Sequence, residues 1–372
     1  MFLQRSIRAA ADRRDMFRPE NTHLTGQDEI VSVIPCKPQI QNSELSQLAL
    51  NRSGKDEPLC YSAFCGYHGV LLYQELWGLI MKRREFLATT AAASAMICRP
   101  QSIFALDDDN MYRKEIGIQL YTLRNEIGRD VKATIKAVAD AGYKQVECYG
   151  FPDADPMIEA ARENGLAINS THFNWDSVVN PDDKGVQPFG EVLDKASEAG
   201  IKHLVVPYLA DKNRKTLDDY KLLCERCNKG AEQAKKAGIQ LSYHNHSFEF
   251  QPMEGGGTGY EILIKEFSPD MHFEVDVFWI QLGGKDPVEM IKQLKGRVSQ
   301  LHLKDLNKSI KAPMYSGIPQ EAFEELGDGV ISMQPILDAA KEAGVKICHV
   351  EQDHSPHPIK SIQQSMAHLK TL

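Results

Sequence analysis

The chain has 372 residues, of which 42% are hydrophobic, and this is enough apolar material for a large core. A single α/β barrel takes about 250 residues, so the length fits one such barrel together with extensions. The formal net charge of −8 gives no electrostatic support for binding to nucleic acid, and no Lys/Arg-rich block of the needed length stands out. We therefore expect no nucleic-acid partner.

The first 80 residues differ from the rest of the chain. Residues 1–80 mix Arg-rich, Pro-containing and apolar pieces without a sustained hydrophobic period. Residues 61–80 are fairly apolar, but Gly, His, Gln and Glu interrupt them, so they make a poor membrane span. We interpret residues 1–80 as a disordered or over-extended N-terminus.

A basic and then weakly apolar segment follows at residues 81–105. Arg83 and Arg84 precede Phe86, Leu87 and a run of small residues, a pattern that resembles a twin-arginine export signal. Because such signals work at an N-terminus, the pattern favours Met81 as the true start. We expect export to the periplasm, with no stable membrane span after the signal is removed. A small amphipathic helix is the alternative, in which case the protein would stay in the cytoplasm.

From Glu115 onward, short β-like runs alternate with helical patterns. The predicted strands cover residues 116–120, 145–149, 167–172, 203–207, 240–245, 272–277, 298–304 and 346–352. The predicted helices cover residues 130–141, 154–164, 189–199, 216–237, 259–267, 287–294, 333–343 and 359–369. An Ala-Gly pair at 141–142, 199–200, 237–238 and 343–344 ends a helix just before a strand, as a C-terminal glycine cap does.

Eight β-then-α units in this length predict a closed parallel barrel, the (β/α)8 or TIM fold, as a catalytic domain over residues 115–372. A doubly wound open sheet is the alternative. That fold usually carries a Gly-rich phosphate-binding turn after its first strand, and residues 121–125 read Tyr-Thr-Leu-Arg-Asn instead.

Active sites of such barrels form at the C-terminal ends of the strands. Polar residues gather at those ends: Glu147, Tyr149, His172, His244, Asn245, His246, Glu249, Glu274, Asp276, His302, Lys304, Asp305, Glu351 and Asp353. Charged side chains inside strands are costly unless they are paired or bind a metal. An Asp, a His and a Glu at matching depth on three successive strands, without a thiolate, suit Mn, Mg, Co or Zn.

Several stretches together resemble the xylose isomerase-like sugar phosphate isomerase/epimerase superfamily, over the region from Glu115 to the end of the chain. They are IQLYTLR at 118–124, YHNHSFEF at 243–250, FEVDVFW at 273–279, LHLKD at 301–305, ELGDG at 325–329 and VEQD at 350–353. The combination is specific for the superfamily, although no single stretch is.

The resemblance implies one divalent metal ion, held by a Glu, an Asp, a His and a second Glu on strands 5 to 8. Asp276, His302 and Glu351 match the last three positions. Strand 5 departs from the pattern, because His244 stands at the usual Glu position. We expect Glu249 to be the fourth ligand, with His244 or His246 as the substitute.

The expected reaction is isomerisation or epimerisation of a sugar. The metal would polarise a carbonyl or hydroxyl group while a carboxylate moves the proton on the neighbouring carbon. We expect Glu351 to act also as the base and Lys304 to hold the enediolate charge. His172, His246 and Glu147 would position hydroxyl groups or shuttle protons.

Other functions stay open at this point. A lyase or hydratase on a 3-keto sugar or glycoside would use the same proton abstraction followed by β-elimination. The predicted export favours it, because phosphorylated sugars are scarce outside the cytoplasm. A non-catalytic sugar-binding protein and an abasic-site endonuclease are further alternatives. The expected partner is a small-molecule sugar or glycoside, on which Phe173, Trp175, Tyr208 and Trp279 could stack; the sequence leaves open whether the chain forms a homo-oligomer.

Overall fold

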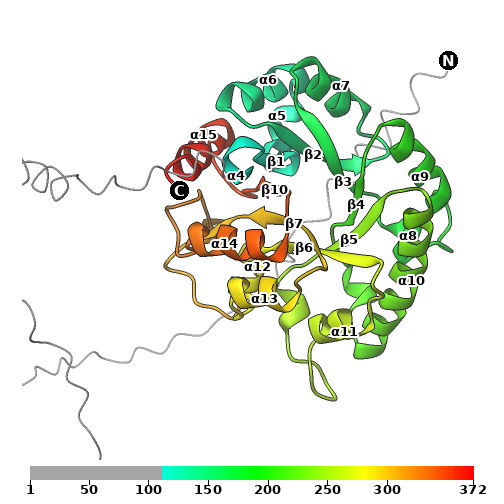
Figure 1. The fold of residues 1–372 in the computed structure, drawn as a ribbon. Coiled ribbons are helices and arrows are strands. Elements are labelled where there is room, and N and C mark those ends of the chain that lie inside the picture. The colour runs from blue at the N-terminus through cyan, green and yellow to red at the C-terminus, as the bar shows by residue number, and fades with distance from the viewer. Residues whose placement is uncertain (1–110) are drawn as a thin grey trace, which may run out of the picture. The chain divides into compact units, whose positions relative to one another are not determined.

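The computed structural model describes residues 111–372, so the expectations for residues 1–80 and 81–105 lie outside the described residues. Within them, parallel strands close into a barrel in the order β1-β2-β3-β4-β5-β6-β7-β10, with β10 beside β1 (Figure 1). The predicted (β/α)8 barrel is confirmed. Its strands are β1 (Gly117–Gln119), β2 (Gln145–Phe151), β3 (Ala167–Phe173), β4 (His203–Val206), β5 (Gln240–His244), β6 (Met271–Asp276), β7 (Val298–Leu303) and β10 (Cys348–Val350).

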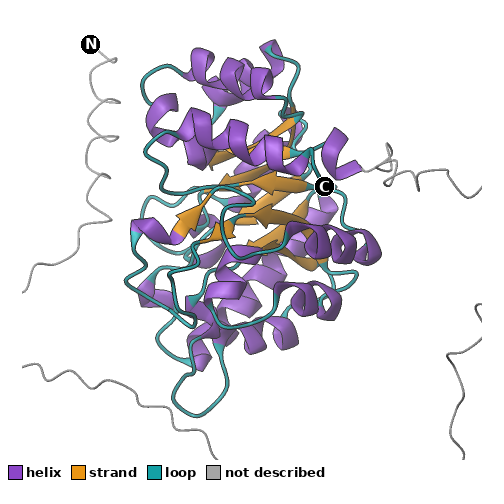
Figure 2. Cartoon of the chain, turned by 90° about the vertical axis from the view of Figure 1, so that its left-hand side faces the viewer, coloured by secondary structure: helices purple, strands orange, loops and turns teal. Residues whose placement is uncertain are grey.

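Helices surround the barrel, and the strands lie inside this outer layer (Figure 2). The longer helices are α6 (Val131–Ala141), α7 (Asp155–Glu163), α9 (Phe189–Glu198), α10 (Leu217–Lys236), α11 (Gly259–Glu266), α13 (Pro287–Gln293), α14 (Met333–Ala343) and α15 (Pro358–Leu369). Short helical turns are α4 (Met111–Lys114), η1 (Leu120–Leu123), α5 (Arg124–Ile127), α8 (Asp176–Val179), η2 (Asp211–Asn213), η3 (Phe248–Phe250), α12 (Val277–Leu282) and η4 (Gln320–Ala322).

Alternation along each strand separates an apolar outer face from a polar inner face, as β6 illustrates. The Phe273 ring packs against Tyr260 of α11 and against Phe267, which follows that helix. Glu274 and Asp276 are fully buried on the opposite face of the strand, inside the barrel. The apolar core therefore lies between strands and helices, and the barrel interior is left for polar groups.

Side chains and glycines cap the helix ends. Asp130 caps α6, and Thr216 forms a reciprocal capping box with Asp219 at the start of α10. Gly142 and Gly344 adopt left-handed conformations, with φ of 104° and 81°, directly after α6 and α14. Each of these glycines ends its helix, and the next strand begins a few residues later, which gives the regular alternation of strand and helix.

Strand register aligns the polar residues of neighbouring strands. His244 pairs with Glu274 between β5 and β6, and Asp276 pairs with His302 between β6 and β7. His302 in turn pairs with His349 of β10. Side chains from three or four strands therefore meet at similar depth within the barrel.

Two local features differ from the predicted elements. The first strand ends at Gln119, whose side chain accepts a hydrogen bond from the Tyr121 amide and starts the turn η1. After β7, a two-stranded antiparallel sheet forms from β8 (Asp305–Leu306) and β9 (Phe323–Glu324). Within residues 111–372, no helix combines the length and hydropathy that crossing a membrane requires.

Candidate active site

Two buried carboxylates, Glu147 of β2 and Glu274 of β6, lie at the centre of the barrel interior. Glu147 accepts hydrogen bonds from Gln119 Nε2 at 2.8 Å, from Gln300 Nε2 at 2.7 Å and from the Ser170 hydroxyl. The Gln300 side chain also donates to Glu274, so one amide group links the two carboxylates. Neither carboxylate is exposed to solvent, and both are held by neutral donors.

Three imidazoles surround this pair of carboxylates. His172 Nε2 lies 2.8 Å from Glu274 Oε2, and His244 Nδ1 lies 2.9 Å from the same oxygen. His302 uses both ring nitrogens: Nε2 lies 2.6 Å from Glu147 Oε2, and Nδ1 lies 2.9 Å from Glu351 Oε2. The imidazoles thus separate the deep carboxylates from the acidic groups nearer the barrel mouth.

Near the mouth, Lys304 faces three carboxylates. Its Nζ lies 2.8 Å from Glu351 Oε2, 2.9 Å from Asp353 Oδ2 and 3.1 Å from Asp276 Oδ2. Asp276 Oδ1 accepts the amide hydrogens of Phe278 and Trp279 and thereby caps α12. Its other oxygen, Oδ2, is buried and accepts no hydrogen bond of proper geometry.

The residues of this site could hold a metal ion in more than one way. His244, Asp276, His302 and Glu351 form one group in which a ligand atom of each lies within 4.8 Å of the others. Two further groups share His302 with it, and the first of them shares His244 as well. They are His172, His244, Glu274 and His302, and Glu147, Glu274, His302 and His349. A buried cluster of imidazoles and carboxylates with metal-binding capacity is therefore present in the barrel.

In this cluster, the fields of neighbouring charged groups shift pKa values in the direction opposite to the effect of burial. Burial alone would lower the pKa of His302, but the carboxylates of Glu274, Glu351 and Glu147 raise it well above its usual value. Burial would raise the pKa of Glu351, but Lys304 and His302 hold it well below its usual value. The pKa of Lys304 rises well above normal, because Asp276, Asp353 and Glu351 outweigh burial. These groups therefore stay charged in each other's presence.

His246 has the opposite character. Its ring stacks on Phe248 with centroids 5.2 Å apart, and it also contacts Trp279 at 4.8 Å and Tyr208 at 5.4 Å. Burial, and next to it the positive fields of His244 and Lys304, lower the pKa of His246 well below its usual value. Its Nδ1 makes no hydrogen bond. His246 is therefore a neutral imidazole at the rim of the cluster.

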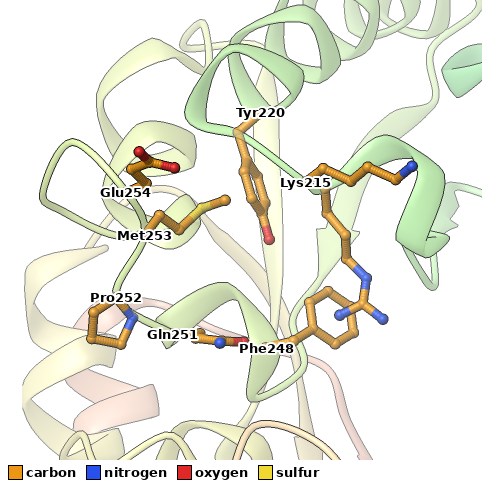
Figure 3. A pocket seen from close by; sticks show the side chains of 8 residues that line it. Lys215, Tyr220, Phe248, Gln251, Pro252, Met253 and Glu254 are labelled. Carbon is orange, nitrogen blue, oxygen red and sulfur yellow. The ribbon is translucent and has the colours of Figure 1, made fainter.

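A pocket adjoins this aromatic rim. Loops that follow β4 and β5 frame it, so it opens at the same end of the barrel as the cluster (Figure 3). The Arg214 guanidinium lies 3.5 Å above the Phe248 ring, and this ring also stacks with His246. The lining residues are Arg214, Lys215, Tyr220, Phe248, Gln251, Pro252, Met253 and Glu254.

Glu249, the expected fourth ligand, is not among the residues of the three groups that could hold a metal ion. Its carboxylate accepts hydrogen bonds from the Tyr243 hydroxyl at 2.7 Å and from the His246 amide at 2.8 Å. Tyr243 neighbours His244 on β5 and therefore faces the helix layer, where its ring packs against Phe267. The strand-5 contribution inside the barrel comes from His244, the substitute that the sequence also offered.

Other predicted residues fall into place differently. Glu147 is fully buried and pairs with His302, His172 pairs with Glu274, Lys304 pairs with Glu351, and His246 lies against Trp279. Phe173 is not available for stacking on a sugar at the mouth, because it is buried against Phe189 of α9 in the helix layer.

Asp305 anchors the loop after β7. Its carboxylate accepts the backbone amides of Leu306, Gly327, Gly329 and Ile331. This anchoring explains the Gly-Asp-Gly turn at 327–329 and holds the loop that carries Phe323, whose ring packs on Phe278 and Trp279 beside the cluster.

The site also contains three residues that were not predicted from the sequence: Gln119, Ser170 and Gln300. Gln300 lies two positions before His302 on β7, and Ser170 lies two positions before His172 on β3, so strand alternation points them into the same interior. That alternation was the signal that could have found them.

Comparisons with known proteins agree with this architecture. The family model described as "Xylose isomerase-like TIM barrel" matches residues 135–372. An inosose dehydratase of Mesomycoplasma hyopneumoniae is 27% identical over 276 residues, covering 66% of this chain and 91% of that protein. An inosose dehydratase of Clostridium perfringens is 26% identical over 245 residues, covering 59% of this chain and 82% of that protein.

A solved structure of a sugar phosphate isomerase/epimerase from Parabacteroides distasonis is 26% identical, with a TM-score of 0.56. The similarity covers 69% of this chain and 93% of that one. The family match spans more than half of the chain and includes every residue of the cluster except Gln119. This chain belongs to the xylose isomerase-like TIM barrel family.

Proposed function

We propose that this protein is a divalent-metal-dependent dehydratase that removes water from a polyhydroxylated cyclic ketone, such as a keto-cyclitol or a 3-keto sugar or glycoside. One observation carries the proposal: the Lys304 ammonium lies beside Asp276 and Glu351, while strand β5 supplies imidazoles in place of a carboxylate. The similarity to inosose dehydratases, which extends over most of their length, supports the same reaction class.

His244, Asp276, His302 and Glu351 would hold the ion. Asp276 Oδ2, which lacks a hydrogen bond, lies 3.8 Å from His244 Nε2 and 4.0 Å from His302 Nδ1. Ligands about 2.1 Å from a tetrahedral ion are roughly 3.4 Å apart, so small inward shifts would complete the site. The donor set of imidazole nitrogens and carboxylate oxygens suits Mn, Co or Zn and, with fewer imidazoles engaged, Mg. When bound, the ion would polarise the substrate carbonyl.

The chain's own residues would manage the proton and the charge. His246 is neutral, so it can accept the proton from the carbon next to the carbonyl, while the C–H electrons move toward the carbonyl oxygen. The Lys304 ammonium would hold the negative charge on that oxygen. When the carbonyl re-forms, the bond to the β-hydroxyl breaks, and His246 returns the proton to the departing oxygen. Water and an unsaturated ketone result.

Sugar isomerisation or epimerisation is the second candidate. It shares the first proton transfer but returns the proton to carbon, so the product keeps the mass of the substrate. The similarity to the Parabacteroides distasonis isomerase/epimerase supports this candidate.

The test is to incubate the full chain, loaded in turn with Mn²⁺, Co²⁺ and Zn²⁺, with a keto-cyclitol, a 3-keto-glucoside and free ketoses in deuterated water. We expect mass spectrometry to show loss of one water from the first or second substrate. Interconversion of the sugar without loss of water, with deuterium taken up at the carbon next to the carbonyl, would establish the isomerase or epimerase instead. Neither loss of water nor deuterium incorporation with any of the substrates would refute enolisation altogether.

A matched pair of variants tests the role of His246. We expect His246→Asn to lower kcat by about 100-fold or more, within the range for loss of a general acid–base group, with the metal affinity unchanged. His272→Asn, at the opposite end of the barrel on β6, is the control and should leave kcat unchanged.

Export through the segment 81–105 also remains a proposal. Sequencing the N-terminus of the mature protein from the periplasm would support it if the chain began after Ala105. A product that began at Met1 would refute it.

A further inference from the structure

We infer that Glu147 and Glu274 are positioning residues that fix how the two histidines meet the metal, so that His302 offers Nδ1 and His244 offers Nε2. This inference rests on the proposed metal binding. It concerns two carboxylates that lie behind the proposed ligands and do not themselves belong to the group at the barrel mouth.

At His302, the two ring nitrogens face different layers. Nε2 lies 2.6 Å from Glu147 Oε2, deep in the barrel, so Nε2–H donates to that carboxylate. Nδ1 faces the mouth, 2.9 Å from Glu351 Oε2 and 4.0 Å from Asp276 Oδ2. Because Nε2 keeps its proton in this hydrogen bond, Nδ1 is the nitrogen that would give up its proton and offer a lone pair to the ion.

At His244, the assignment is reversed. Nδ1 lies 2.9 Å from Glu274 Oε2, and Nε2 lies 3.8 Å from Asp276 Oδ2. Glu274 therefore takes the proton-bearing side of His244 and turns Nε2 toward Asp276 Oδ2, the oxygen of that carboxylate without a hydrogen bond. The two histidines meet the same Asp276 oxygen through opposite ring nitrogens.

The two carboxylates cannot turn away from the imidazoles. The Glu147 oxygens also accept Gln119 Nε2 at 2.8 Å, Gln300 Nε2 at 2.7 Å and the Ser170 hydroxyl. Gln300 donates to Glu274 as well, and His172 Nε2 lies 2.8 Å from Glu274 Oε2. Each imidazole thus rests on a fixed negative charge, which raises its strength as a metal donor.

The same bonds argue against a deeper ion with Glu147 as its ligand. A carboxylate has about four lone-pair directions. Glu147 uses them for Gln119, Ser170, Gln300 and His302, so none is left for a metal. The mouth group is the better fit, because Asp276 Oδ2 accepts no hydrogen bond and contacts only the ammonium of Lys304 and the neighbouring imidazoles.

The decisive measurement uses the wild-type full chain loaded with Zn²⁺, which is diamagnetic. Nitrogen-15 NMR of the histidine rings identifies the nitrogen through which each ring binds the ion. We expect Nδ1 for His302 and Nε2 for His244, each with a protonated second nitrogen. The opposite nitrogen at either ring would overturn the inference. This measurement needs no variant, so it stands even if a variant fails to fold.

Two variants then test the dependence. We expect Glu147→Gln and Glu274→Gln each to weaken Zn²⁺ binding about 10- to 100-fold in competition with a chromogenic chelator, at an unchanged stoichiometry of one ion per chain. Zinc-dependent changes in the ring signals should be lost first at His302 for Glu147→Gln and first at His244 for Glu274→Gln. Glu163→Gln, at a glutamate of α7 that pairs with Lys132 outside the barrel, is the control and should leave Zn²⁺ affinity unchanged.

The possible failures are separable. Unchanged Zn²⁺ affinity in both glutamine variants, or two ions per wild-type chain, overturns the positioning role while metal binding stands. A wild-type chain that binds no Zn²⁺, Co²⁺ or Mn²⁺ refutes the proposed function itself, and the positioning role with it.

Discussion

Replacing Glu249 by Gln separates two readings of that residue, as a metal ligand or as a buried acid in the helix layer. The structure places its carboxylate between the Tyr243 hydroxyl and the His246 amide, with no exposure to solvent. Burial there raises the pKa of Glu249 to about 8, against the opposing effect of these two hydrogen bonds. Gln has nearly the same shape and carries no charge; its Oε1 can accept the His246 amide hydrogen while its Nε2 donates to the Tyr243 hydroxyl oxygen.

The magnitude follows from proton linkage. The pKa of Glu249 rises from 4.5 to about 8 on folding, so the folded state binds its proton more tightly than the unfolded state. Stability from this group is complete below the unfolded pKa and is lost as pH rises toward the folded pKa. At ~1.4 kcal/mol per unit, the full shift corresponds to ~5 kcal/mol. Of this stabilisation of the folded state, ~3 kcal/mol is lost as pH rises from 6 to 9.

The assay is urea unfolding of wild type and Glu249→Gln at pH 6 and pH 9, with the difference in unfolding free energy compared between the two pH values. Other titrating groups are shared and cancel in this difference. We expect the variant to gain ~3 kcal/mol relative to wild type as pH rises, while its metal affinity stays unchanged. A pH-independent difference would refute the buried-acid reasoning. A loss of metal affinity of tenfold or more would return Glu249 to the ligand set.

Two further substitutions probe the mouth of the barrel. Asp276→Asn keeps the acceptor that caps α12 but removes the charge at Oδ2, so metal affinity should fall by about 100-fold and saturating metal should no longer raise the melting temperature; retained thermal stabilisation by metal would contradict its role as a ligand. Asp305→Ala removes the acceptor of four backbone amides, one at Leu306 and three in the loop at 327–331. We expect the free energy of unfolding in urea to fall by ~3 kcal/mol and the loop to become sensitive to protease. An unchanged cleavage pattern would show that the loop is held by other contacts.

The barrel was predictable because its signals are local. Strand-length apolar runs, helical periods and Ala-Gly stops each depend on a few neighbouring residues, and the described strands begin and end within a few positions of the predicted ones. Asp276, His302 and Glu351 were predictable as a group for a related reason. Parallel strands bring their C-terminal ends to one side of a barrel, so three polar residues at the same depth must lie near each other.

The place of Glu249 could not be predicted in this way. It follows β5 in the short turn η3, where the strand period no longer fixes the direction of a side chain. The turn aims the carboxylate at Tyr243, on the outer face of β5, and leaves His244 as the strand-5 residue inside the barrel.

The sequence by itself determined the repeat, the closed barrel and the strand ends at which charged side chains gather, because periodicity and turn chemistry are properties of adjacent residues. Only the tertiary structure decided which side chains meet across the barrel. Gln300 links Glu147 to Glu274, and these two carboxylates take opposite nitrogens of His302 and His244. Such pairings depend on the closure and stagger of eight strands, which bring together residues more than a hundred positions apart.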